Sequence, residues 1–254
     1  MKRHAILFLI SYSLIAVIFI FSRGLELSEC DVGVIQGFIE WFGVLYGLLL
    51  AMIVVEVWQK YNLINNEIDK EADALYLLVK TAGYAKNTVQ HQNLLRIIHD
   101  YAAFVSQTKN GYENSAEKTN GHLKKLYDCV GEIVCGLKSD AIATELIHRV
   151  NEVVDTRGDW IARTKEHISN QLWILLIIAS CVWLLSFFGL KIQSIWIALV
   201  IVGSSVFVVT ALLSFAADLD NPKTGLWTPN FDSFDLVLEE TSKLLNKSGG
   251  GTTH

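Results

Sequence analysis

Four long apolar segments constrain this chain more than any other feature of its sequence. They span residues 5–22, 34–55, 172–190 and 195–217. At 1.5 Å per residue, a helix of each length crosses a hydrocarbon core about 30 Å thick. Because lipid offers no hydrogen-bond partners, the backbone of each segment must satisfy its own polar groups as a helix. The sequence therefore predicts an all-α membrane protein with four transmembrane helices.

These segments divide the chain into two membrane hairpins and two polar regions. Residues 1–58 form the first predicted hairpin, and residues 171–217 form the second. Between them, residues 59–170 carry 14 basic and 15 acidic side chains, a balance typical of a water-facing helical domain. Residues 218–254 contain a turn cluster, a short amphipathic helix at 231–245 and a flexible tail at 248–254.

The first segment follows a basic start, Met1–His4, and invites comparison with a signal peptide. Its apolar run of 18 residues is longer than the usual apolar region of a signal peptide, and no small-x-small cleavage site follows it. We therefore expect residues 5–22 to be retained as a transmembrane helix.

The lysine and arginine residues near the ends of the segments set the expected orientation. The loop after the first segment has Arg23 among acidic residues, and the loop after the third segment has Lys191. The opposite side is richer in basic residues: Lys2, Arg3, Lys60, Lys70, Arg157, Arg163 and Lys165. We expect both termini and the helical domain to be cytoplasmic.

Apolar periodicity and breaking residues outline the helices of the polar region. The second segment continues without a turn signal to a helix end at Gly83, and a further helix spans about 86–107. The polar stretch 108–121 is expected to be a mobile loop before a helix at 123–137. Ser139 is a candidate N-cap for a helix that continues unbroken into the third segment.

One face of the second segment combines polar and small residues. At about 100° per residue, its members fall within about 40° of Glu40, except Gly43 at about 60°. They are Gln36, Glu40, Gly43, Gly47, Ala51, Val54 and Trp58. The Gly43–Gly47 pair permits close helix packing within one subunit, and equally a face that lines a water-filled path or an oligomer axis. Glu40 is expected to point to water or to a partner, since a carboxylate in lipid is costly.

Other functional classes find little support in the sequence. The net charge of -5 gives no reason to expect nucleic-acid binding. The four cysteines match no zinc or redox spacing, and the histidines lack the spacing of a helical metal site. No nucleophile elbow, phosphate loop or dinucleotide loop is present. We therefore expect no cofactor, no metal and no enzymatic activity.

Several short motifs together resemble a known family. They are Phe42–Leu50, Val57–Asn62, Glu71–Leu75, Asp155–Arg157 with Arg163, and Asp218–Pro222 with Gly225. As a set they resemble the bestrophin-like family of bacterial four-span membrane proteins, relatives of the bestrophin channels. The resemblance is strongest over residues 34–227. This chain has Lys223 where the family usually has an aromatic residue, so no role resting on that aromatic is carried over.

The resemblance implies an activity and an assembly. Bestrophins are pentameric anion channels, with some bacterial members passing cations, and their second helix lines the pore. We accordingly expect a homo-oligomer in a bacterial inner membrane, most simply a pentamer, that conducts inorganic ions along the second helix. Two alternatives remain at this stage: a non-conducting membrane scaffold or signalling protein, and a stator-like ion-driven subunit.

The expected orientation is open to a direct test. A membrane-impermeant thiol reagent should label Cys30 in intact spheroplasts and leave Cys129 and Cys135 unlabelled, because the last two lie in the predicted cytoplasmic domain. Labelling can be measured by mass shift after solubilisation. The reverse pattern would place the helical domain outside the cell.

Overall fold

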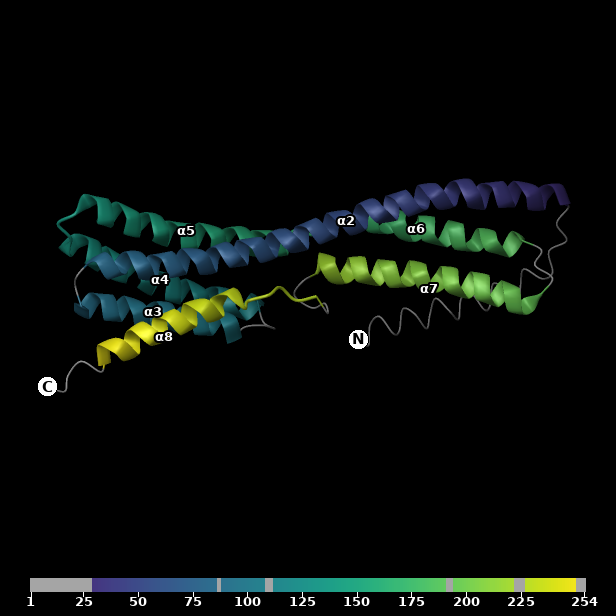
Figure 1. The fold of residues 1–254 in the computed structure, drawn as a ribbon. Helices are drawn as coiled ribbons and strands as arrows, with labels where there is room; N and C mark the ends of the chain where they lie inside the picture. The colour runs from purple at the N-terminus through teal and green to yellow at the C-terminus, as the bar shows by residue number, and fades with distance from the viewer. Residues whose placement is uncertain (1–28, 86–87, 108–111, 191–193, 222–226, 250–254) are drawn as a thin grey trace. The chain divides into compact units, whose positions relative to one another are not determined.

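The computed structural model describes residues 29–85, 88–107, 112–190, 194–221 and 227–249. These residues form seven α-helices and two short 3-10 turns, and none of them belongs to a strand (Figure 1). The predicted all-helical class is therefore confirmed for the part of the chain that the structure describes. The first predicted membrane helix, residues 5–22, lies outside the described residues.

Contacts divide the chain into two compact units. Unit one comprises Met1–Gln59 and His167–Asp220, and unit two comprises Lys60–Glu166 and Asn221–His254. Helix α2 (Glu29–Ala82) contributes its first part to unit one and the rest to unit two. The prediction that the second apolar segment continues as one helix into the polar region is confirmed, since α2 runs for 54 residues.

Unit one is built from the first part of α2, with α6 (Asn170–Ser186) and α7 (Ile195–Asp220) running beside it (Figure 1). The short 3-10 turn η2 (Phe187–Gly189) follows α6. The core of this unit contains residues from all three helices: Tyr46, Leu50, Ile53, Leu176 and Val209. One polar link crosses it, a 2.7 Å hydrogen bond between the hydroxyls of Tyr46 and Ser180. The Ser180 hydroxyl also donates to the Leu176 carbonyl, so this buried polar pair is satisfied.

The outward surface of unit one is apolar. Met52 on α2 is 71% exposed and Val200 on α7 is 70% exposed, and many large apolar neighbours are similarly uncovered. A continuous surface of this kind requires lipid or another protein against it. Within the described residues, α2 and α7 are long and apolar enough to cross a bilayer. A third span is added if α5 and α6, broken at 166–169, are counted together.

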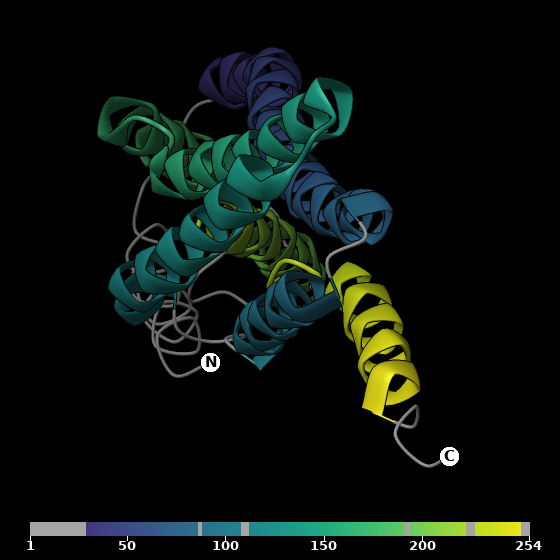
Figure 2. The ribbon, with the colours of Figure 1, turned by 90° about the vertical axis from the view of Figure 1, so that its left-hand side faces the viewer.

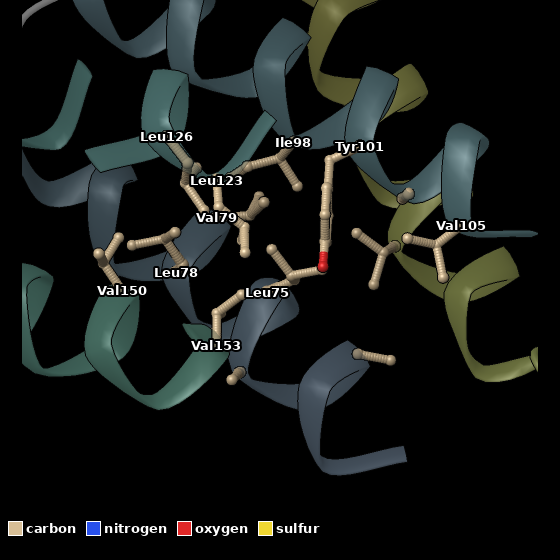
Figure 3. Packing of buried hydrophobic residues seen from close by; sticks show 14 of the residues in the cluster. Leu75, Leu78, Val79, Ile98, Tyr101, Val105, Leu123, Leu126, Val150 and Val153 are labelled. Carbon is tan, nitrogen blue, oxygen red and sulfur yellow. The ribbon is translucent and has the colours of Figure 1, made fainter. Parts of the chain in front are cut away.

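Unit two is a helical bundle formed around the second part of α2. Its other helices are α3 (Thr88–Gln107), α4 (Tyr112–Gly136), α5 (Asp140–Lys165) and α8 (Ser233–Gly249). Figure 2 shows α8 beside α3. The close view in Figure 3 shows apolar side chains from α2, α3, α4 and α5 converging on one interior. Leu75, Leu78 and Ile98 in this interior are 0% exposed.

The ends of two helices agree only in part with the sequence analysis. Helix α2 ends at Ala82, as expected from Gly83, and the chain continues in the 3-10 turn η1 (Gly83–Ala85). Helix α8 extends four residues beyond the predicted end at 245 and covers the beginning of the expected tail. The remainder of that tail, residues 250–254, lies outside the described residues.

The prediction of a loop at 108–121 is wrong for residues 112–121, which form the first turns of α4. The stretch contains strong helix formers, among them Glu113, Ala116 and Glu117, and a single Gly121 within a helix costs only about 1 kcal/mol. Thr119 is 1% exposed, so this end of the helix is anchored in unit two. Tertiary packing thus outweighs the local turn signals.

The prediction of one helix continuing from Ser139 into the third segment is also wrong. Helix α5 begins after Ser139 as expected but ends at Lys165, and α6 begins at Asn170. Two side chains satisfy backbone groups at the break. The Ser169 hydroxyl accepts from the amide of Leu172, and Asp220 accepts from the amide of Ile168 at 3.0 Å. These caps supply the partners that an unbroken helix would have provided.

The interior of unit two gives a matched stability test. Leu75→Ala removes a fully buried side chain and should lower the free energy of unfolding by about 2–5 kcal/mol. Leu77→Ala makes the same change at a position on α2 that is 40% exposed, and it should cost much less. Denaturant-induced loss of helical circular dichroism measures both. Equal losses for the two variants would contradict the described packing of α2.

Candidate functional site

The seven residues singled out on the second segment all lie on α2 within unit one. Gln36, Glu40, Gly47 and Ala51 are exposed. The side-chain amide of Gln36 donates to a carboxylate oxygen of Glu40 at 3.3 Å. This bond requires the two side chains to share one face, as the helical spacing predicted.

Gly43 lies on the inner edge of the predicted stripe. A Cβ atom built there would stand 2.9 Å from Nε1 of Trp183 on α6, which is closer than real Cβ contacts come. The Trp183 ring in turn stacks on Tyr46 with centroids 5.7 Å apart. Gly43 therefore permits α2 and α6 to approach within one chain, which is the packing role the sequence left open.

Two other members of the stripe also make contacts inside unit one. Val54 is half-buried and packs against the core of this unit. The Trp58 ring stacks on Phe215 of α7 with centroids 6.4 Å apart. Gly47, by contrast, has no described atom within 4 Å of a Cβ built on it, and Ala51 is exposed. The stripe thus has an inner edge of Gly43, Val54 and Trp58, and a free edge.

The free edge consists of Gln36, Glu40, Gly47 and Ala51, and a bulky apolar face adjoins it. At about 100° per residue, the residues of this face project away from Tyr46, Leu50 and Ile53 of the core. They are Val44, Leu48, Met52 and Val55, and each is more than half exposed. Sequence reasoning passed over them because, in an almost wholly apolar helix, hydropathy does not distinguish the faces.

Two further features of the described residues bear on metal or small-molecule binding. No group of three or more histidine, cysteine or carboxylate side chains within them is arranged to hold a metal ion. A surface pocket of about 280 Å³ in unit two is lined by Asp73, Tyr76 and Lys243 among others. Its carboxylates include Glu239 and Glu240, which pair with Lys243 and Lys80 at 2.5 Å. The candidate site therefore remains the free edge of α2.

Comparison with known proteins identifies the family. The sequence profile of the Bestrophin-like domain matches residues 5–226, which is most of the chain. The chain belongs to the bestrophin-like family. The resemblance seen in the motifs of α2, α5 and the end of α7 is thereby confirmed, and the family together with the apolar surface of unit one supports a membrane location. No curated protein matches this bestrophin-like chain.

Solved structures share the fold of this bestrophin-like protein at low sequence identity. A variant of a bacterial bestrophin homologue from Klebsiella pneumoniae superposes with a TM-score of 0.72 at 13% identity, covering 96% of this chain and 98% of its own. A second variant of the Klebsiella pneumoniae homologue gives 0.70 at 12% identity, covering 97% and 96%. A variant described as a membrane protein gives 0.73 at 13% identity, covering 96% and 98%. At these identities the likeness concerns the fold alone.

Gly47 offers a test of which surface the free edge meets. Gly47→Leu has room within the described chain, so the subunit should still fold. If this edge meets a partner or a conducting path, the added side chain overpacks it, at a cost of about 1–3 kcal/mol. We expect the oligomer to dissociate more readily in detergent, measured by native mass spectrometry, or conductance in bilayers to fall.

The Gly43→Ala variant is the matched contrast for this test. It should disturb the Trp183 contact within one subunit, and so lower subunit stability rather than assembly. If Gly47→Leu left both assembly and conductance unchanged, the free edge would face neither a partner nor a path.

Proposed function

We propose that this bestrophin-like chain forms a homo-oligomeric ion channel whose conducting path is lined by α2. Members of this family are ion channels and not enzymes, which supports a channel-type function. The observation that carries the finer proposal is the free edge of α2. A carboxylate, an amide and two small residues share an exposed strip on α2, whose remaining surface between residues 38 and 55 is apolar or packed.

The chemistry of this strip suits an ion path. A carboxylate on a membrane helix is costly unless it meets water or a partner. Glu40 is exposed and is held by Gln36. Small residues at Gly47 and Ala51 leave width where several copies of α2 approach one axis. One such carboxylate per subunit forms a ring, and acidic rings favour cations at the entrance of a pore.

The number of subunits and the location complete the proposal. The bestrophin resemblance favours five copies around the axis, with inorganic ions and the lipid bilayer as the only partners required. The resemblance favours a bacterial inner membrane, and the asymmetry of basic residues favours both termini in the cytoplasm. Of the two alternatives raised by the sequence, a scaffold explains the apolar surface but gives no role to the Gln36–Glu40 pair. The stator-like alternative needs a partner carboxylate for Glu40, and such subunits usually carry a functional proline in their later membrane helices, which segments 172–190 and 195–217 lack.

Charge removal at Glu40 tests the proposal. Glu40→Gln keeps the size of the side chain and should shift the reversal potential toward anion preference under a salt gradient in reconstituted bilayers. Glu56→Gln is the matched control, because Glu56 is also exposed on α2 but projects about 160° away, and it should leave selectivity unchanged. Absence of conductance in the wild type at every pH and voltage tried would favour the scaffold. Conductance with selectivity unaltered by Glu40→Gln would place the path elsewhere.

A further inference from the structure

A carboxylate with no exposed surface lies at the centre of unit two. Glu71, on α2, is 0% exposed and accepts hydrogen bonds from two other helices. The Tyr101 hydroxyl of α3 donates to one carboxylate oxygen, and Nε1 of Trp160 on α5 donates to the other at 2.6 Å. Figure 3 shows Tyr101 extending from α3 toward the turn of α2 that carries Leu75. Three helices thus meet at one carboxyl group.

A buried arginine accompanies this carboxyl group. Arg157 on α5 is 4% exposed, and its Nη1 lies 3.7 Å from a carboxylate oxygen of Glu71. Its Nη2 donates to the Thr119 hydroxyl of α4 at 3.1 Å, and its guanidinium lies 4.4 Å from the centre of the Trp160 ring. Within the described residues, Nε and Nη1 of Arg157 have no hydrogen-bond acceptor. The ion pair is therefore buried but only loosely joined.

The surroundings favour the protonated form of Glu71. Burial raises the pKa of Glu71 above its ordinary value, and this effect exceeds the lowering by Arg157 and by the donors Tyr101 and Trp160. Tyr101 stays neutral, because burial and the nearby Glu71 raise the pKa of its hydroxyl well above the ordinary value. Glu71 is consequently the member of this cluster whose charge changes as pH rises from acid.

Other titratable groups lie nearby on each helix. On α2, Glu67 is buried one turn before Glu71 and pairs with Lys70 at 3.0 Å. On α4, the His122 ring lies 6.3 Å from the Tyr101 ring, centre to centre. On α5, Arg163 follows Arg157 after six residues. None of these three side chains is among the hydrogen-bond or ion-pair partners of Glu71 in the described chain, so a substitution at Glu71 isolates its own titration.

We propose that Glu71, Tyr101, Trp160 and Arg157 form a proton-linked latch that holds α2, α3 and α5 together in unit two. Proton uptake by Glu71 favours the packed arrangement, and proton loss loosens it. The direction follows from linkage: a carboxyl group whose pKa is raised on burial binds its proton more tightly in the packed state than in an opened state. The latch is fully closed below the ordinary glutamate pKa of 4.5 and weakens as pH rises through the raised pKa. This role goes beyond ion conduction and does not depend on it.

Amide hydrogen exchange of the full-length protein in lipid nanodiscs tests the latch. After correction for the intrinsic pH dependence of exchange, protection of the α5 amides around Arg157 should fall with rising pH. Because one proton is linked, the fall should not exceed about tenfold per pH unit. Protection that is constant with pH, or that increases with it, would overturn the proposal.

Three variants sharpen the result. Glu71→Gln resembles the protonated side chain, so its protection should stay at the acid level of the wild type throughout. Tyr101→Phe removes a donor that favours the charged carboxylate, so the fall should move to higher pH. Glu132→Gln alters an exposed carboxyl on α4 and should reproduce the wild-type profile. If protection in Glu71→Gln falls with pH as steeply as in the wild type, the proposal is wrong. If that variant does not fold, a Tyr101→Phe variant whose protection falls at the same pH as the wild type contradicts the proposal.

Discussion

A backbone that crosses lipid must satisfy its hydrogen bonds within its own segment, and this constraint governs α2. Once the apolar residues 34–55 are helical, the charged stretch after them has no proline or turn to end the helix before Gly83. The same helix therefore serves two environments. In unit one its buried side carries Tyr46, Leu50 and Ile53, and in unit two it carries Ile64, Ile68 and Leu75. The packing of both units depends on this one element.

The two units solve the problem of buried polar groups in different ways. In unit one, Tyr46 and Ser180 share a neutral hydrogen bond, which avoids burying a charge. In unit two, Glu71 and Arg157 are both buried, and desolvation of such a pair is offset only when its partners are well placed. Tyr101 and Trp160 each donate a hydrogen bond to the Glu71 carboxylate. The Arg157 guanidinium, by contrast, donates through one nitrogen, to Thr119. Burial raises the pKa of Glu71 despite these partners, and removing one member of such a buried pair leaves the other without its compensation.

Sequence periodicity predicted the helices well where apolar spacing and breaking residues agreed. The continuous α2, the start of α5 after Ser139 and the existence of α8 follow from local pattern. The break at 166–169 could not be predicted from local pattern, because its hydrogen bonding involves Asp220, which lies over fifty residues further along the chain. The start of α4 at Tyr112 was not predicted, because the asparagine and glycine residues of this stretch favour turns. Tertiary contacts outweigh that local preference. For the candidate site, helical spacing grouped Gln36 with Glu40 correctly. The different surroundings of Gly43 and Gly47 could not be predicted, because only the position of α6 shows that Gly43 meets Trp183 while Gly47 has open space.

Three glutamates on α2 illustrate how position decides the role of the same side chain. Glu40 and Glu56 are exposed in unit one, where a charge is tolerated only toward water, headgroups or a partner. Glu71 is enclosed in unit two, where two hydrogen-bond donors, Tyr101 and Trp160, and the nearby Arg157 guanidinium replace the water it has lost. An exposed carboxylate presents its charge to its surroundings, whereas the charge of an enclosed one is opposed by burial and met only by neighbouring side chains. Both kinds lie on one continuous helix, so the surroundings within each unit, and not the helix itself, decide which role the side chain can take.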